Sequence, residues 1–425
     1  MALAINGGQK AVTVEAVEQW QPPYDELCGA ANELIRRDAL SGDWEKTYFR
    51  FEDEFKNYIG TKYACAFNTG TTALWGAYYA LGIKPDDEVI CPSYTWVSTI
   101  SPAVHMGARP VFCELEENKV VADPADIEKR ITQKTKAIVV VHLFGNIVNM
   151  DAVMAISKKY GIPVIEDCSH CHGAEWNGKK CGSIGDIGCF SMQGNAIGGK
   201  ALPAGEGGII VTDSQDLYSK IIFYTQMNRP YRESDGPFDE YAIYGSERCG
   251  MKFRAHPIGL TLASVLFKSL DACNAKKTAY RNKVNDAIKK MPQFITIEND
   301  ERAVPGGFYG GMQFIYKPET LGGLTTKRLI EALKAEGVSM KYRDYQAMHT
   351  MPLYQQGYDL PGIGNAGIGA KGYAGAYYPG CLPVTERVLA NMVGMPVFIE
   401  EPAGYFEQMI VAFDKVISNY KELLS

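Results

Sequence analysis

The stretch from residue 63 to residue 81, YACAFNTGTTALWGAYYAL, decides the fold. Its first part, Tyr63–Phe67, is a short apolar run of the kind that is buried on both faces of a sheet. Its last part, Thr71–Leu81, has the spacing of apolar residues that is typical of a helix. A turn rich in Gly and Thr joins the two, so the stretch is a strand, a turn and a helix.

The same alternation continues along the chain. The next strand-like runs are Glu88–Cys91, Arg109–Glu114, Ala137–Val141, Pro163–Glu166, Ile187–Ser191 and Gly208–Thr212. The helix-like stretches between them are Thr95–Met106, Pro124–Ile131 and Met150–Tyr160. Strands that alternate with helices predict right-handed crossovers onto a mainly parallel sheet that is covered on both faces. The predicted fold class is therefore α/β.

The pattern changes in the last third of the chain. A long helical segment begins around Leu260–Leu270 and continues to about Lys290. Scattered strands follow it, with glycine-rich loops at Gly306–Gly311 and Gly362–Gly372. Helix-like segments return at Thr326–Glu336 and Gly404–Leu424. We predict a large domain over residues 1–270, which includes the N-terminal segment, and a smaller α+β domain over residues 271–425.

The charge and the hydropathy of the chain argue against two kinds of partner and predict where the protein is found. The net charge is −6 and no block of Lys and Arg stands out, which argues against nucleic acid and against an anionic membrane surface. No apolar run approaches the roughly 18 residues that span a bilayer, and Met1–Gln9 does not have the pattern of a secretory signal. The 11 cysteines show no disulfide-scaffold rhythm. These features predict a cytoplasmic protein with reduced thiols.

The turn Asn68–Thr72 is a candidate anion site. Gly70 allows close approach of the backbone, the following helix offers free N–H groups, and Thr71 and Thr72 add hydroxyl donors. A turn in which a Thr merely caps the helix is the commoner reading of any single Gly-Thr pair.

The strand Val164–Asp167 ends in two carboxylates. Ligands of open α/β sheets lie outside the carboxyl ends of the strands, so Asp167 is placed where a cofactor would lie. A protonated pyridine nitrogen is a good partner for such a carboxylate. A helix cap or a structural salt bridge explains this segment equally well.

The segment Cys168–His172 contains two Cys and two His. These residues are too crowded to converge on one ion, so we expect no metal there. One of the histidines is expected to face the same ligand as Asp167.

Lys200 lies in an apolar stretch and is followed by Gly205–Gly208. Desolvation there would lower the pKa of the amine and make it a nucleophile toward an aldehyde. On spacing alone, a solvated surface lysine remains the more common interpretation.

Six ordered motifs together resemble the DegT/StrS family of sugar and cyclitol aminotransferases. They are NTGTTAL at Asn68–Leu74, PSYTWVST at Pro92–Thr99, HLFG at His142–Gly145, EDCSHCHGA at Glu166–Ala174, GDIGCFSMQ at Gly185–Gln193 and KALPAGEGG at Lys200–Gly208. The resemblance implies the fold of the fold-type I transferases of pyridoxal phosphate (PLP). It covers nearly the whole chain, and Asp167–Gln193 is most similar to the cyclitol branch of antibiotic pathways.

The resemblance also implies a role for each matching residue. Lys200 holds PLP as a Schiff base and moves the proton, and Asp167 pairs with the pyridine nitrogen. Trp96 stacks on the ring, and His170 lies near the ring hydroxyl. The phosphate ligands are expected to be Gly70, Thr71, Thr72 and Ser191, with Gln193 beside them. Amino donors are L-glutamate or L-glutamine, the acceptor is a keto-sugar or a keto-cyclitol, and the enzyme is a homodimer.

Two features depart from the family. The interval from Asp167 to Lys200 is a few residues longer, and the excess is the loop Gly194–Gly199. The other lysines between Asp167 and Glu206 are only Lys179 and Lys180, in a polar turn. Where the family has an Asn that reaches the neighbouring subunit's phosphate, this chain has Lys252, which is expected to act as a point charge. Candidates for the donor carboxylate are Arg229, Arg254 and Arg343, and the sequence does not choose among them.

Three alternatives remain. A related PLP-dependent sugar dehydratase would carry His in place of Lys200. A non-catalytic regulatory protein on the same scaffold would need neither Lys200 nor Asp167. A nicotinamide enzyme would need G-x-G-x-x-G after the first strand, which Gly70–Thr72 does not supply.

Overall fold

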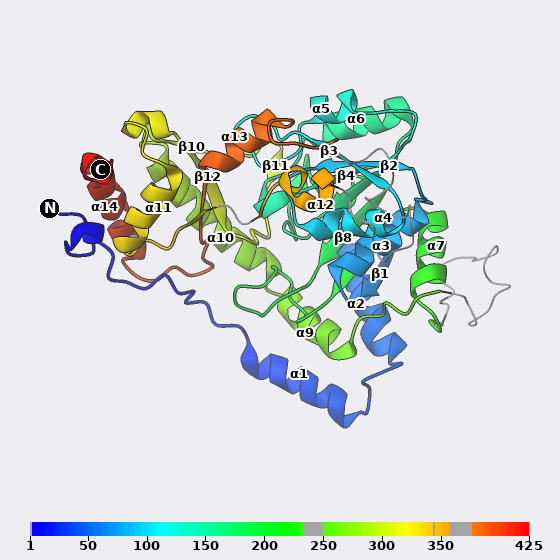
Figure 1. Ribbon diagram of the computed structural model, residues 1–425. Coiled ribbons are helices and arrows are strands. Elements are labelled where there is room, and N and C mark those ends of the chain that lie inside the picture. The colour runs from blue at the N-terminus through cyan, green and yellow to red at the C-terminus, as the bar shows by residue number, and fades with distance from the viewer. Residues whose placement is uncertain (1, 231, 233–249, 343–344, 357–375, 425) are drawn as a thin grey trace.

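The computed structural model describes residues 2–230, 232, 250–342, 345–356 and 376–424. The predicted loop at Gly362–Gly372 lies outside the described residues. Figure 1 shows a large sheet with its helices on one side of the molecule and a smaller group of strands and helices, which includes α11 and α14, on the other.

A seven-stranded sheet forms the centre of the larger part. Its order is β1-β9-β8-β5-β4-β2-β3, and the pairs β2·β3, β2·β4, β4·β5 and β5·β8 are parallel. The strands are β1 (Tyr63–Phe67), β2 (Glu88–Pro92), β3 (Arg109–Cys113), β4 (Thr135–Val141), β5 (Val164–Asp167), β8 (Ile187–Ser191) and β9 (Gly208–Thr212). The mainly parallel α/β sheet is thus confirmed. One strand, β9, runs antiparallel to both of its neighbours.

Helices cover both faces of this sheet, as its apolar strands predict. Alternate strand residues fall into two separate cores: Ala64 and Ile138 belong to one cluster, and Cys65 and Val139 to the other. The helices of this part are α1 (Tyr24–Arg36), α2 (Arg50–Ile59), α3 (Gly70–Ala80), α4 (Ser101–His105), α5 (Pro124–Lys129), α6 (Met150–Tyr160), α7 (Gln215–Thr225) and α9 (Pro257–Phe267).

Two predicted helices are interrupted. The stretch Thr95–Met106 contains a single 3₁₀ turn, Val97–Thr99, followed by the short helix α4, which has Pro102 in its first turn. The long helical segment after residue 260 is two helices, because α9 ends at Phe267 and α10 (Leu270–Ile288) begins three residues later. Periodicity alone does not detect such a break, since both halves carry helix-forming residues.

The smaller part contains a four-stranded sheet in the order β10-β12-β14-β13. Its elements are β10 (Phe294–Thr296), β12 (Met312–Tyr316), β13 (Lys341–Tyr342), β14 (Met392–Met395), α11 (Thr326–Ala335), α13 (Pro383–Asn391) and α14 (Tyr405–Ser418). The short helix α12 (Pro352–Gln356) packs on the large sheet instead, because its Tyr354 lies in the same cluster as Cys65 and Val139. A small third sheet joins β11 (Ala303–Val304), β6 (Glu175–Trp176) and β7 (Lys179–Lys180).

The N-terminal segment packs against the C-terminal elements. Leu3 and Val12 lie in the same apolar cluster as Phe314, Leu329 and Phe413, and Figure 1 shows the blue N-terminal segment beside α14. The division into domains at residue 270 stays a prediction. No helix in the described part of the chain is long and apolar enough to cross a bilayer.

Candidate active site

A cavity of about 550 Å³ lies where α3 begins and where β5 and β8 end. It brings together eight of the residues that the sequence singles out, from positions far apart in the chain. They are Gly70, Thr71, Trp96, Asp167, His170, Ser191, Gln193 and Lys200. Two others, Thr72 and Lys252, are not among the lining residues.

Lys200 has the environment that its proposed chemistry needs. Its residue is only 8% exposed, and burial lowers the pKa of its amine to about 7, with the Asp167 carboxylate opposing the shift. The amine lies 3.6 Å from the centroid of the Tyr309 ring. The neighbouring alternative, Lys180, instead pairs with Glu175 at 2.9 Å in the β6–β7 hairpin. A solvated surface position for Lys200 is therefore wrong.

Asp167 ends β5 and is held from two sides. The Thr99 hydroxyl donates to Oδ2 at 2.8 Å, and the backbone N–H of Ser169 donates to Oδ1 at 3.1 Å. The preceding Glu166 points to the opposite face of the strand, as successive strand residues do. There it accepts three backbone N–H groups and contacts Nε2 of His142 at 3.1 Å. Only Asp167 of the two carboxylates lines the cavity.

The start of α3 has the properties of an anion site. The Thr69 side chain caps the helix by accepting from the N–H of Thr72 at 3.0 Å. No described residue accepts the N–H of Gly70 or of Thr71, so both remain available beside the positive end of the helix dipole. A Cβ at position 70 would lie 2.6 Å from Cβ of Ser191, so only glycine allows α3 to approach β8 this closely.

The hydroxyl of Thr72 is used within the turn itself. It donates to Oδ1 of Asn68 at 2.6 Å and lies 3.0 Å from the Thr69 carbonyl. Its predicted contact with a phosphate stays a prediction.

Two ring systems complete the cavity. Trp96 is 55% exposed, so it is not a core aromatic residue. His170 is buried, and Nδ1 accepts from the backbone N–H of Phe144 at 3.4 Å. Burial, together with the nearby Lys200, holds the pKa of this imidazole well below its ordinary value. The neutral ring then carries its proton on Nε2, which makes that nitrogen a hydrogen-bond donor.

Sequence reasoning missed two residues that touch this machinery. Thr99 belongs to the motif Pro92–Thr99, but nothing in the sequence tells that its hydroxyl reaches Asp167. Tyr309 comes from the glycine-rich loop Gly306–Gly311, more than 100 positions after Lys200, and no local pattern connects the two. An aromatic residue inside a glycine-rich loop is the one signal that the sequence offers.

The histidine and cysteine segment after Asp167 is buried. His142, Glu166 and Cys168 bring ligand atoms within 4.8 Å of one another, but the Glu166 oxygens already accept backbone N–H groups. The absence of a metal here stays a prediction. His172 is buried, and burial lowers the pKa of its imidazole to about 3.

The remaining basic candidates lie elsewhere. Lys252 forms an isolated bridge with Gln226, and its role toward a second subunit stays a prediction. Arg229 forms two hydrogen bonds with the buried Glu52, at 2.8 and 2.7 Å, and has a structural role. The guanidinium of Arg254 lies 5.3 Å from the Trp44 ring. Neither arginine lines the cavity, and Arg343 lies outside the described residues.

Comparison with known proteins places this geometry in a family. The chain is 32% identical, over 83% of both chains, to an L-glutamine:2-deoxy-scyllo-inosose aminotransferase of Streptoalloteichus tenebrarius. It is 29% identical, over 99% of both chains, to a protein of the same name from Micromonospora echinospora. Among solved structures, an aminotransferase from Psychrobacter cryohalolentis superposes with a TM-score of 0.81 at 24% identity, covering 96% of this chain and 99% of its own. The structural likeness confirms the fold expected from the sequence motifs.

The model of the DegT/DnrJ/EryC1/StrS aminotransferase family matches residues 26–365. That range contains the whole cavity described above. The chain belongs to the DegT/DnrJ/EryC1/StrS aminotransferase family.

Proposed function

We propose that this aminotransferase uses PLP, held at Lys200, to move an amino group from L-glutamine or L-glutamate to a ketone of a cyclitol or a sugar. The observation that carries the proposal is the buried Lys200 amine in one cavity with the Asp167 carboxylate and the free start of α3. The names of the relatives, which specify L-glutamine and an inosose, support the donor and the acceptor class.

The groups in the cavity fit PLP in kind. The N–H groups of Gly70 and Thr71, with the Ser191 hydroxyl, suit a phosphate. Asp167 is fixed by Thr99 and Ser169 and suits a protonated pyridine nitrogen. Two other predicted contacts also fit PLP. The exposed face of Trp96 suits a flat ring, and Nε2 of His170 suits a ring oxygen.

When bound, PLP supplies an electron-withdrawing ring that stabilises negative charge on the substrate carbon. The protein supplies the proton transfer. Because the pKa of Lys200 is about 7, its amine holds and releases a proton with similar ease near neutral pH, which suits a general base that later acts as an acid. The Asp167 carboxylate opposes loss of the positive charge at Lys200 and keeps the amine from becoming a permanently neutral group.

A homodimer in the cytoplasm is part of the proposal. Lys252 would then lie at the contact between two copies and contribute to the partner's phosphate site. The ten described cysteines are free thiols, which agrees with a reducing compartment.

The transfer of the amino group from the donor to the enzyme, which is the first half of the reaction, tests the proposed function. Purified protein that contains PLP should be yellow, and L-glutamine should bleach that absorbance and yield the corresponding keto acid in stoichiometric amount. A keto-cyclitol or a keto-sugar should then restore the colour. Protein that holds PLP at Lys200 but is bleached by neither L-glutamine nor L-glutamate would refute amino transfer from these donors. Lys200, where dehydratase relatives carry His, argues against the dehydratase alternative.

A further inference from the structure

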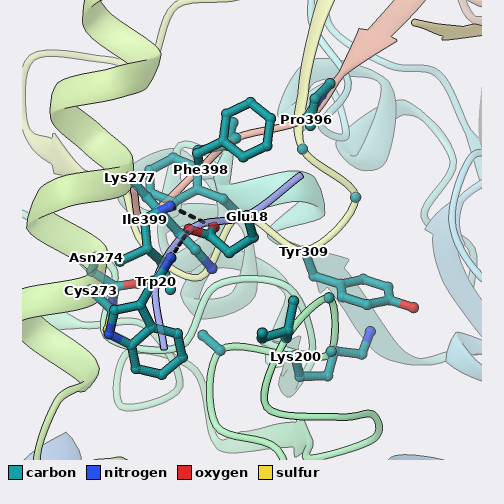
Figure 2. Close-up of a pocket in the computed structure, with 18 of the residues that line it drawn as sticks. Glu18, Trp20, Lys200, Cys273, Asn274, Lys277, Tyr309, Pro396, Phe398 and Ile399 are labelled. Carbon is teal, nitrogen blue, oxygen red and sulfur yellow. Dashed lines mark hydrogen bonds between the residues drawn. The ribbon is translucent and has the colours of Figure 1, made fainter. Parts of the chain in front are cut away.

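A second cavity lies directly behind the catalytic lysine. It has a volume of about 360 Å³ and shares only Lys200 and Tyr309 with the first cavity. Figure 2 shows Lys277, Asn274 and Cys273 on α10 at one side, and Tyr309 and Lys200 at the other. A cavity of this size accommodates a small organic molecule. We call it the rear cavity.

The additional loop before Lys200 forms one wall of the rear cavity. Its residues 196–199 line the cavity, together with Trp20 from the N-terminal segment. This loop is the part of the sequence that we predicted to depart from the family in length, and the function proposed above does not use it. The rear cavity therefore includes a wall that the extra residues of this chain build.

Apolar and aromatic side chains form part of the remaining wall, beside three lysines, Lys200, Lys277 and Lys341. Phe308, Met340 and Phe398 are each less than 5% exposed, and Trp20 is partly buried. Such walls favour the flat, apolar body of a ligand over a sugar rich in hydroxyl groups.

One of these lysines, Lys277, forms no ion pair with a carboxylate of the described residues. It forms one hydrogen bond, to the carbonyl of Gly307 at 3.3 Å. An ammonium group has three donors, so two remain available to a ligand. Burial lowers the pKa of Lys277, and an anion beside it would reverse that effect.

The nearby carboxylate of Glu18 raises the pKa of Lys277 through its charge, but it forms no ion pair with that lysine. Its Oε1 accepts from the N–H groups of Trp20 and Glu400, and its Oε2 accepts from that of Ile399. These bonds, two of them drawn in Figure 2, hold Glu18 to the backbone at the rim.

We propose that the rear cavity is a binding site for a small organic carboxylate with an aromatic or otherwise flat apolar body, whose carboxylate pairs with Lys277 and whose body packs between Trp20 and Phe398. Such a molecule would lie behind Lys200, against the loop that carries it. The site does not depend on PLP chemistry, so its test is independent of the proposed function.

Calorimetric titration of the purified protein, with PLP bound or without it, with phenylacetate and with its neutral isostere phenylacetamide tests the proposal. Phenylacetate should bind about tenfold more tightly than phenylacetamide, because only the carboxylate gains a charge-assisted hydrogen bond. Lys277→Met should remove this difference, and Lys277→Arg should keep it. The matched control is Lys276→Met, at the preceding residue of α10. The exposed side chain of Lys276 pairs with Glu400, so this variant should keep the preference for phenylacetate.

Each outcome of the titrations either supports or refutes the proposed carboxylate site. Equal affinity for the acid and the amide, no saturable binding of phenylacetate, or a preference that survives Lys277→Met would overturn the proposal. Should Lys277→Met fail to fold, the comparison of acid and amide in the unaltered protein and in Lys277→Arg still decides.

Discussion

The buried amine of Lys200 should make the folded protein without PLP less stable at low pH. Burial lowers the pKa of this group from 10.5 to about 7, a difference worth about 5 kcal/mol. Between these two pH values the unfolded chain binds a proton at Lys200 that the folded chain does not bind. Stability therefore rises with pH across this window, and the full cost is present below pH 7.

Replacing Lys200 by Met removes the titrating group and keeps the volume of the side chain nearly unchanged. Below pH 7 the Lys200→Met apoprotein should be more stable than the unaltered apoprotein by up to about 5 kcal/mol. The advantage should shrink by about 1.4 kcal/mol per pH unit above pH 7 and vanish near the ordinary pKa of lysine.

Urea unfolding of both apoproteins between pH 6 and 10 measures this difference. Lys179→Met, at an exposed lysine of the β6–β7 hairpin, controls for the loss of a lysine as such. A Lys200→Met difference that does not change with pH would refute the assignment of Lys200 as a desolvated amine.

Three further predictions follow from other contacts. Thr99→Val removes the hydroxyl that donates to Asp167 and should weaken PLP binding by about 1.5–3 kcal/mol, measured by absorbance titration. Thr99→Ser keeps a hydroxyl and should bind PLP as the unaltered protein does. Equal affinity for PLP in the unaltered protein and both variants would contradict this role of Thr99. Gly70→Ala places a Cβ 2.6 Å from Cβ of Ser191 and should displace the start of α3. The variant should therefore lose more affinity for PLP than for pyridoxal, which lacks the phosphate. Arg229→Met leaves the buried Glu52 without its partner and should lower the free energy of unfolding by about 3–5 kcal/mol. A sharp rise in the Michaelis constant for L-glutamine in the folded variant would instead indicate that Arg229 binds the donor.

The central sheet was predictable because its signal is local. Three strands, β1, β8 and β9, have the predicted bounds, since apolar runs buried on both faces end where polar or glycine residues begin. The antiparallel direction of β9 was not predicted, because a short apolar run does not reveal its direction. The contact of Leu3 with the C-terminal cluster was not predicted either, since it joins the two ends of the chain.

The candidate site was predictable where motifs carry it. Gly70 begins α3 and Asp167 ends β5, and topology alone brings such positions together. Lys200 lies in the loop between β8 and β9, and only its motif identified it. Thr99 and Tyr309 were missed because their contacts depend on how a 3₁₀ turn and a distant loop pack onto the sheet. Loop conformation has no periodic signal in the sequence.

Reduction with borohydride is the most direct test of the central claim, that the amine of Lys200 holds the cofactor. Treatment of the yellow protein should fix one pyridoxyl group on the peptide that contains Lys200, and Lys200→Ala should yield no such adduct and no turnover with L-glutamine. A pyridoxyl group on another lysine of the unaltered protein, or full turnover by Lys200→Ala, would contradict the account.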